Sequence, residues 1–224
     1  MPSVKIPRKS TSTDMTPFVD VAFLILSFFM LATKFKPPEP VKISTPHSVS
    51  SAQLKDQDAV LIEFDSTGKV YFTVNTKKSS DNSIKYDLIK AINQSQNLGL
   101  TEGEMQNFVK NTTVGAPFNS IKQVLSVPAD QRGNLKQPGI PVDTANNQLK
   151  TWIGTAITAF QGHQLNYMVK GDNNAKYPSF KGVIEAFRAN DQYKYQLITD
   201  PESAPYGTEL YEIRQKNGGA RENE

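Results

Sequence analysis

One acidic residue, Asp20, stands at the start of the most apolar stretch of the sequence. From Val21 to Ala32 the sequence reads VAFLILSFFMLA, in which Ser27 is the only polar residue. A charged carboxylate among apolar side chains is unfavourable, and an apolar environment favours its protonated, neutral form. Such a group can bind a proton and release it again. The chemistry that this segment suggests is therefore proton transfer.

A structural role for Asp20 is the alternative. Acidic side chains stabilise the first turn of a helix, because the helix dipole and the unpaired N–H groups there attract negative charge. Thr16 followed by Pro17 is typical of a helix start, with a hydroxyl cap before a residue that lacks an N–H group. The residues alone leave both roles open. Asp14, a second acid, precedes the proline and is expected in the aqueous flank.

The apolar segment is long enough to cross a membrane only if Asp20 is included. As a helix, Val21 to Ala32 would cover about 18 Å of a hydrocarbon core of roughly 30 Å, whereas Pro17 to Phe35 would cover about 28 Å. No small-x-small cleavage site follows, which favours an uncleaved signal anchor over a cleaved signal peptide. Basic residues flank both ends, but the short N-terminal stub favours an N-inside, C-outside arrangement.

Composition excludes several classes of function. The 25 Lys and Arg residues are scattered along the 224-residue chain and the net charge is only +3, so we expect no nucleic-acid binding. The absence of cysteine excludes disulfides, thiolate metal ligands and a cysteine nucleophile. Two histidines without HExxH spacing make a metal site unexpected. Without a nucleophile elbow or a phosphate loop, we expect no enzyme activity and no cofactor.

The region after the apolar segment predicts a helix-backed α+β sheet. The turn residues of FDSTGKV separate two β-rich runs, which indicates a hairpin. Apolar residues at helical spacing predict two helices, with Trp152 and Phe187 in the core. The predicted order is hairpin, helix, strand, helix, strand: Leu61–Glu63 with Val70–Val74, Gln148–Phe160, Leu165–Val169, Ser179–Arg188 and Tyr195–Thr199.

The predicted domain organisation has five parts. A stub over residues 1–14 precedes a transmembrane helix over 15–36, and a flexible linker covers 37–57. The α+β domain covers 58–216, and residues 217–224 form a disordered tail. A helical insertion over residues 76–147 interrupts the domain. Its expected parts are short helices at Ile84–Ile92, Met105–Val109 and Ile121–Leu125 and a loop at Pro128–Ala145.

Three segments resemble the ExbD/TolR family. DMTPFVDVAFLILSFFMLA, residues 14–32, has the family's Thr-Pro-x-x-Asp-Val start before one apolar span. VKISTP, residues 41–46, resembles the family's short extended motif, with Thr45 in place of a leucine. YMVKGDNNAKYPSFKGVIEAFRANDQYKYQLITD, residues 167–200, resembles its closing strand, helix and strand. In this third segment, Asp172 is expected to have only a structural role, in a turn or helix cap.

The resemblance implies a subunit of an energy-transducing complex in the bacterial inner membrane, with a cytoplasmic N-terminus and a periplasmic C-terminal domain. Two copies of the helix would sit inside a ring of an ExbB/TolQ-like multi-span partner. Proton flow would power a TonB- or TolA-like protein. In this reading Asp20 binds the proton, Thr16 and Thr33 line its path, and Val41, Lys42, Ile43 and Pro46 contact a partner.

Several alternatives remain at this stage. A TolR-like role in envelope maintenance is as compatible with the motifs as TonB-dependent transport. A membrane-tethered module that binds peptidoglycan or a partner peptide would use Asp20 only as a helix cap. A flagellar-stator-like subunit would also carry an intramembrane aspartate, but no large peptidoglycan-binding domain is recognisable. Replacing Asp20 by Asn separates the binding module from the transducers, because a binding module would keep full function whereas a transducer would assemble but fail.

Overall fold

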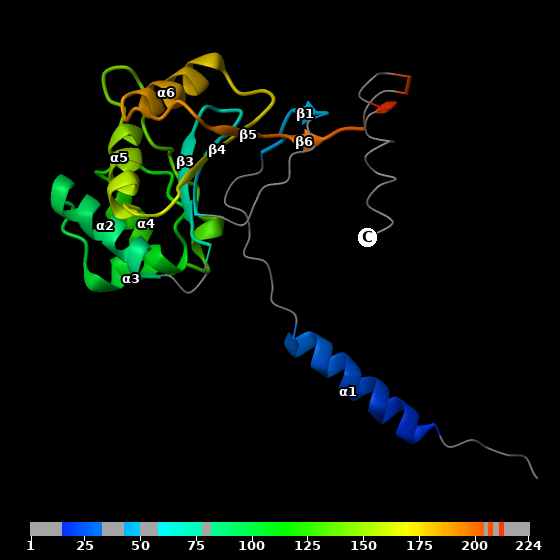
Figure 1. Cartoon of the computed structure of the whole chain (residues 1–224). Helices are drawn as coiled ribbons and strands as arrows, with labels where there is room; N and C mark the ends of the chain where they lie inside the picture. Colours follow the sequence, from blue (N-terminus) through cyan, green and yellow to red (C-terminus); the bar gives the residue numbers. More distant parts are fainter. Residues whose placement is uncertain are drawn as a thin grey trace, which may run out of the picture. The chain divides into compact units, whose positions relative to one another are not determined.

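The chain forms two compact units, Met1–Pro37 and Pro38–Glu224. The computed structural model, shown in Figure 1, describes residues 15–32, 43–49, 58–77, 82–203, 206–207 and 211–212. The described part of the first unit, residues 15–32, forms helix α1 (Thr16–Ala32). The second contains a four-stranded sheet with helices packed against it, which confirms the predicted α+β class.

Helix α1 begins earlier than its sequence signals suggest. The backbone N–H of Val19 donates to the carbonyl of Met15 at 3.0 Å, so Met15, not Thr16, is the residue that precedes the first turn. The prediction that Thr16 is the cap is therefore wrong, and the first turn contains no acidic residue. Along the residues that the structure describes, no helix has the length and apolar character needed to cross a membrane. The predicted continuation through Phe35 lies outside the described residues.

The sheet has the strand order β3-β2-β4-β5. Strands β2 (Ala59–Phe64) and β3 (Val70–Asn75) form the predicted antiparallel hairpin, and β4 (Asn166–Gly171) and β5 (Gln196–Ile198) add in parallel. In the hairpin turn, one carboxylate oxygen of Asp65 accepts hydrogen bonds from the backbone N–H groups of Thr67 and Lys69 at 2.8 and 2.9 Å. Gly68 has φ +87°, a conformation that side chains disfavour.

Helices from both halves of the domain bury one core against the sheet. Helix α5 (Leu149–Ala159) precedes β4, and α6 (Tyr177–Arg188) connects β4 to β5, as predicted. Trp152 of α5 is fully buried, and its ring lies 4.9 Å from Phe72 of β3 and 5.9 to 6.0 Å from Phe118 and Phe108 (centroid distances). The predicted core position of Phe187 is also confirmed, at 1 % exposure.

The insertion is helical, as predicted, and belongs to this same core. It contains α2 (Asn82–Gln96), α3 (Glu102–Lys110), α4 (Ile121–Ser126) and the short 3₁₀ helix η1 (Arg132–Asn134). The last of these lies inside the segment predicted as a loop. Arg132 is 1 % exposed and donates hydrogen bonds to the carbonyls of Asn111 and Asn107 at 2.6 and 3.0 Å. The guanidinium thereby satisfies carbonyls at the C-terminal end of α3.

The insertion also covers the outer edge of β3. Phe72 and Val114 exchange two backbone hydrogen bonds, at 2.8 and 2.9 Å, and the N–H of Ile140 donates to the carbonyl of Val70 at 2.8 Å. Farther along β3, the hydroxyl of Thr112 donates to the carbonyl of Val74 and accepts from its N–H. Two separate segments of the insertion, residues 112–114 and the segment at Ile140, thus occupy backbone groups that an edge strand would expose.

Part of the predicted linker is fixed to the domain. Residues His47–Ser48 form β1, which pairs in parallel with β6 (Asp200–Pro201) immediately after β5 (Figure 1). The N–H groups of Asp200 and Glu202 donate to the carbonyls of Pro46 and Ser48 at 3.0 and 2.9 Å. The prediction of a flexible linker is therefore wrong for residues 43–49. The rest of the linker and the tail after residue 216 lie outside the described residues.

Candidate functional site

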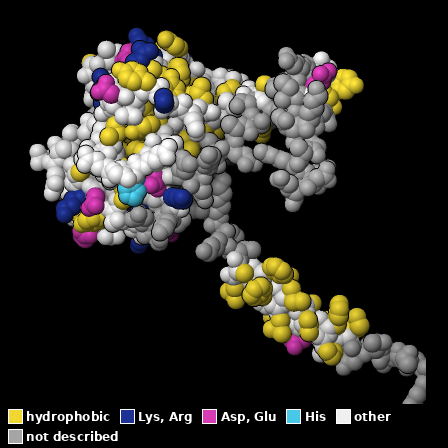
Figure 2. Space-filling view, viewed as in Figure 1, with side chains coloured by type: hydrophobic (Ala, Val, Ile, Leu, Met, Phe, Trp, Pro, Cys, Tyr) yellow, Lys and Arg dark blue, Asp and Glu magenta, His cyan; other side chains and the backbone are white. Residues whose placement is uncertain are grey.

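Asp20 is the only charged residue of α1. Its side chain is exposed, and Figure 2 shows a single acidic group on a helix otherwise covered by apolar side chains. Because Asp20 lies beyond the first turn, its own N–H is inside the regular helical pattern and the carboxylate is not at a capping position. The helix therefore presents a single carboxylate among side chains that are mostly apolar.

A shallow hollow on α1 surrounds this carboxylate. It is lined by Met15, Thr16, Val19, Asp20 and Phe23, which lie on one side of the helix. Thr16 precedes Asp20 by four residues, so the two side chains share a face. This places one of the two predicted path residues beside the carboxylate. The other, Thr33, lies outside the described residues.

The predicted partner-binding motif is described in part. Ile43 and Pro46 are described, whereas Val41 and Lys42 are not. Pro46 contributes its carbonyl to the pairing with β6, and the intervening Thr45 is buried at 4 % exposure. In this structure the described part of the motif contacts the chain's own domain.

Asp172 joins this motif to the sheet. The sequence predicted only a turn or helix cap for this residue and no contact with the motif. One of its carboxylate oxygens accepts from the N–H of Asn174 at 2.9 Å, and the other accepts from the N–H of Ser44 at 3.0 Å. In return, the N–H of Asn173 donates to the carbonyl of Ser44 at 2.8 Å. These hydrogen bonds to the charged form, from Asn174 first and Ser44 second, lower the pKa of Asp172 below its usual range.

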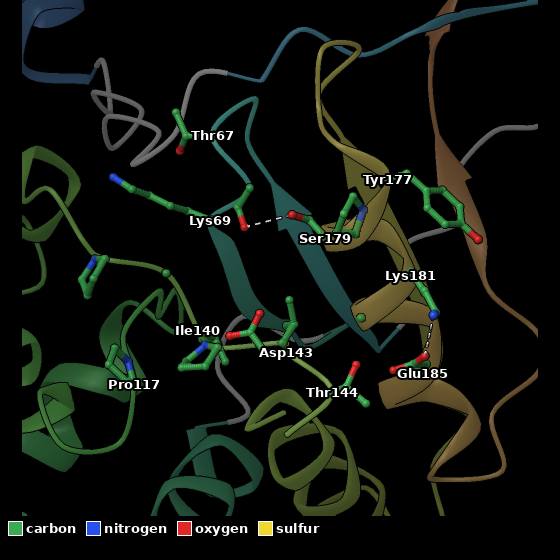
Figure 3. Close-up of a pocket in the computed structure, with 17 residues that line it drawn as sticks. Thr67, Lys69, Pro117, Ile140, Asp143, Thr144, Tyr177, Ser179, Lys181 and Glu185 are labelled. Atoms are coloured by element: carbon green, nitrogen blue, oxygen red, sulfur yellow. Dashed lines mark hydrogen bonds and ion pairs between the residues drawn. The ribbon is translucent and has the colours of Figure 1, made fainter. Parts of the chain in front are cut away.

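A groove of about 870 Å³ opens at the end of the sheet where β2 and β4 lead into their loops. Its walls are the hairpin turn at residues 67–69, the insertion loop at 138–144 and the first turns of α6, as Figure 3 shows. The hydroxyl of Ser179 donates to the carbonyl of Gly68 at 3.3 Å, which ties α6 to the hairpin turn. The insertion therefore supplies one wall of the groove.

The lining of the groove is mixed in character. Tyr177 is 71 % exposed at the start of α6, and Lys181 and Glu185 form an ion pair at 3.8 Å on the same helix (Figure 3). Asp143 and Lys69 add one charge of each sign. An exposed aromatic ring among paired charges and prolines suits an extended peptide or a saccharide better than a compact ion. Among the described residues, no three His, Cys, Asp or Glu side chains come together as metal ligands would.

Comparison with known proteins gives one match. A family model described as Biopolymer transport protein ExbD/TolR matches residues 7–202. The matched range contains α1 with Asp20, the docked segment 43–49, every strand of the domain, and the insertion. No protein of curated function and no solved structure matches the chain.

Proposed function

This chain belongs to the ExbD/TolR family of biopolymer transport proteins, and on that basis we propose that it is a subunit of a proton-driven motor complex in the bacterial inner membrane. The motor uses the proton motive force, through Asp20, to energise TonB-dependent transport across the outer membrane. The subunit has no enzyme activity of its own and uses no cofactor. A TolR-like role in envelope maintenance is the other assignment within the family.

The observation that carries this proposal is the position of Asp20 on α1. It is the one charged side chain on an apolar helix, and it lies past the turn in which a carboxylate would serve as a cap. The 17 residues of α1 give a helix of about 25 Å, and the apolar core of a bilayer is roughly 30 Å thick. We propose that α1 and the residues flanking it cross this core once, with the N-terminus in the cytoplasm.

The proposed mechanism follows from the two charge states of Asp20. The ionised carboxylate needs water or a polar neighbour, whereas the neutral acid tolerates an apolar surface. Protonation from one side of the membrane and release to the other would therefore change which surface the helix prefers. Repeated alternation would move α1 relative to a surrounding ring. Because α1 carries no basic partner for Asp20, the rest of the pathway belongs to other chains.

The proposed partners supply those chains. An ExbB/TolQ-like multi-span protein forms the ring, two copies of this chain place two Asp20 side chains inside it, and a TonB- or TolA-like protein receives the motion. The described part of the extended motif, Ile43 to Pro46, is hydrogen-bonded to Asp172 and β6. This contact places the motif at the domain surface, where a partner strand could compete for it.

Substitution of Asp20 by Asn tests the proposal. Asn keeps the size and the hydrogen-bonding groups of the side chain but cannot exchange a proton, so uptake driven by the proton motive force should fall to the level of a strain without the chain. Protein abundance and copurification of the ring partner should be unchanged. Asp14→Asn, which removes an acid that precedes the apolar segment in the sequence, is the matched control and should transport normally. Normal uptake by Asp20→Asn at normal abundance would show that Asp20 is not the proton site.

The groove supports a second candidate function, a membrane-tethered module that binds a partner peptide or peptidoglycan. Its volume and its mixed lining around Tyr177 are the observations in favour. In that case the double variant Tyr177→Ala, Lys69→Ala should fail to restore the function of cells that lack the chain. Asp20→Asn should restore it fully. If the chain is a motor subunit, Asp20→Asn should instead fail to restore that function.

A further inference from the structure

Three polar residues lie on one face of α1. Thr16, Asp20 and Ser27 are the only residues of the helix that are not apolar. Spacings of four and seven residues bring their directions within an arc of about 40° at 3.6 residues per turn. Ser27 therefore faces the same way as Asp20, two turns farther along the helix. The sequence showed Ser27 as the one interruption of the apolar run but gave it no role.

The hydroxyl of Ser27 is oriented by the helix itself. It donates a hydrogen bond to the carbonyl of Phe23 and makes a longer contact of 3.5 Å with the carbonyl of Leu24. This bond leaves the oxygen lone pairs of Ser27 as acceptors on the Asp20 face. Ser27 is also the only residue of α1 that is partly buried, since all the others are exposed. The helix thus presents a fixed acceptor at this position.

We propose that Ser27 is a positioning residue on the proton entry path to Asp20, an inference that rests on the proposed function. With the N-terminus in the cytoplasm, Ser27 lies about 10 Å from Asp20 toward the periplasm, at 1.5 Å of rise per residue. Its lone pairs hold a water molecule on a face that is otherwise apolar between the two residues. A proton from the external solution passes through this water molecule to the Asp20 carboxylate, which becomes the neutral acid, and the water molecule is left neutral. Ser27 keeps its own hydroxyl proton throughout, hydrogen-bonded to the Phe23 carbonyl.

The matched variants are Ser27→Val and Ser27→Thr, which have the same shape and differ only in the hydroxyl. The assay reconstitutes the chain with its copurified ring partner in lipid vesicles. A potassium diffusion potential drives proton uptake, which a pH-sensitive dye reports. Ser27→Thr should conduct within about twofold of the unaltered chain. Ser27→Val should conduct about three- to tenfold more slowly, the effect of one lost hydrogen bond on a rate.

The pH profile separates a proton path from a merely structural role. If Ser27 assists proton entry, the defect of Ser27→Val should grow as the external pH rises, because entry becomes limiting when protons are scarce. A bend or packing defect would slow uptake equally at every pH. A relocated hydroxyl, Ser27→Ala with Ala22→Ser on the opposite face, should stay slow.

Two outcomes overturn the inference, and Asp20→Asn distinguishes them. If Asp20→Asn abolishes uptake while Ser27→Val equals Ser27→Thr at all pH values, the motor function stands and the role of Ser27 is refuted. If Asp20→Asn conducts normally, the proposed function fails and the role of Ser27 falls with it. If Asp20→Asn is inactive and Ser27→Val, but not Ser27→Thr, shows a pH-dependent defect, both the motor function and the role of Ser27 are supported.

Discussion

Replacement of Arg132 by Met should destabilise the domain more than any loop substitution at the surface. Arg132 lies in the insertion, yet it is 1 % exposed and its two terminal nitrogens donate to the carbonyls of Asn111 and Asn107. Burial lowers the pKa of its guanidinium to about 10, so the group is still charged at neutral pH. Met fills similar space but removes the guanidinium donor from both carbonyls, and the carbonyl of Asn107 keeps only the backbone N–H of Asn111, at 3.3 Å.

The magnitude follows from these two bonds. A hydrogen bond to a charged group contributes about 1.5 to 3 kcal/mol, and a buried carbonyl that loses its donor keeps its desolvation cost. We take the lower figure for each bond, because burying the guanidinium itself is unfavourable. The expected loss in the free energy of unfolding is therefore about 3 kcal/mol. Arg132→Lys should lose less, since one ammonium group can still reach a carbonyl.

Trp152 provides the assay. It is the only tryptophan of the chain, is fully buried, and packs against Phe72 of the sheet and Phe108 of the insertion. Its fluorescence in a urea titration of the micelle-held chain therefore reports the whole domain. Lys136→Met, an exposed position of the same loop, is the control and should change stability by less than about 0.5 kcal/mol. A loss below about 1 kcal/mol for Arg132→Met would refute the role of the guanidinium as the cap of α3.

Two further predictions concern titratable groups. Asp172→Asn should release the docked segment, since an amide replaces the carboxylate oxygen that accepts from Ser44; faster hydrogen–deuterium exchange of residues 43–49, absent in Asp143→Asn, would show it. Because the pKa of Asp172 is lowered in the folded state, the attachment is complete above the usual carboxyl range and should be lost as the pH falls through the lowered pKa. Burial first, then Asp65 and Glu63, raise the pKa of Tyr71 from 10.0 to about 12. Stability in alkaline urea titrations should therefore fall between pH 10 and about 12, where the unfolded phenol ionises first; a Tyr71→Phe chain that shows the same fall would contradict this cause.

The regular elements were predictable because their signals are local. Apolar residues at helical spacing around Trp152 and Phe187 predict α5 and α6, and Asp65 to Gly68 predict the hairpin turn. The remaining contacts depend on residues distant in sequence. His47 and Ser48 show no strand pattern of their own, and β1 exists only because β6 lies beside it.

The candidate site was predictable to a similar extent. The position of Asp20 in an apolar helix could be predicted from sequence, and its place beyond the first turn could not, because helix starts shift by a residue. The groove had no sequence signal, since its walls come from the hairpin, the insertion and α6. The burial of Arg132 had no sequence signal either, because a basic residue in a Pro- and Gly-rich loop is usually exposed.

The covered edge of β3 limits how this protein can associate with itself. A sheet extends into a filament only if both of its outer strands can accept another, as in amyloid stacking. Here Thr112, Val114 and Ile140 occupy the backbone groups of β3, and β5 is the outer strand on the other side of the described sheet. Growth through strand addition would therefore stop after one step. The domain is in this way protected from polymerisation by strand addition.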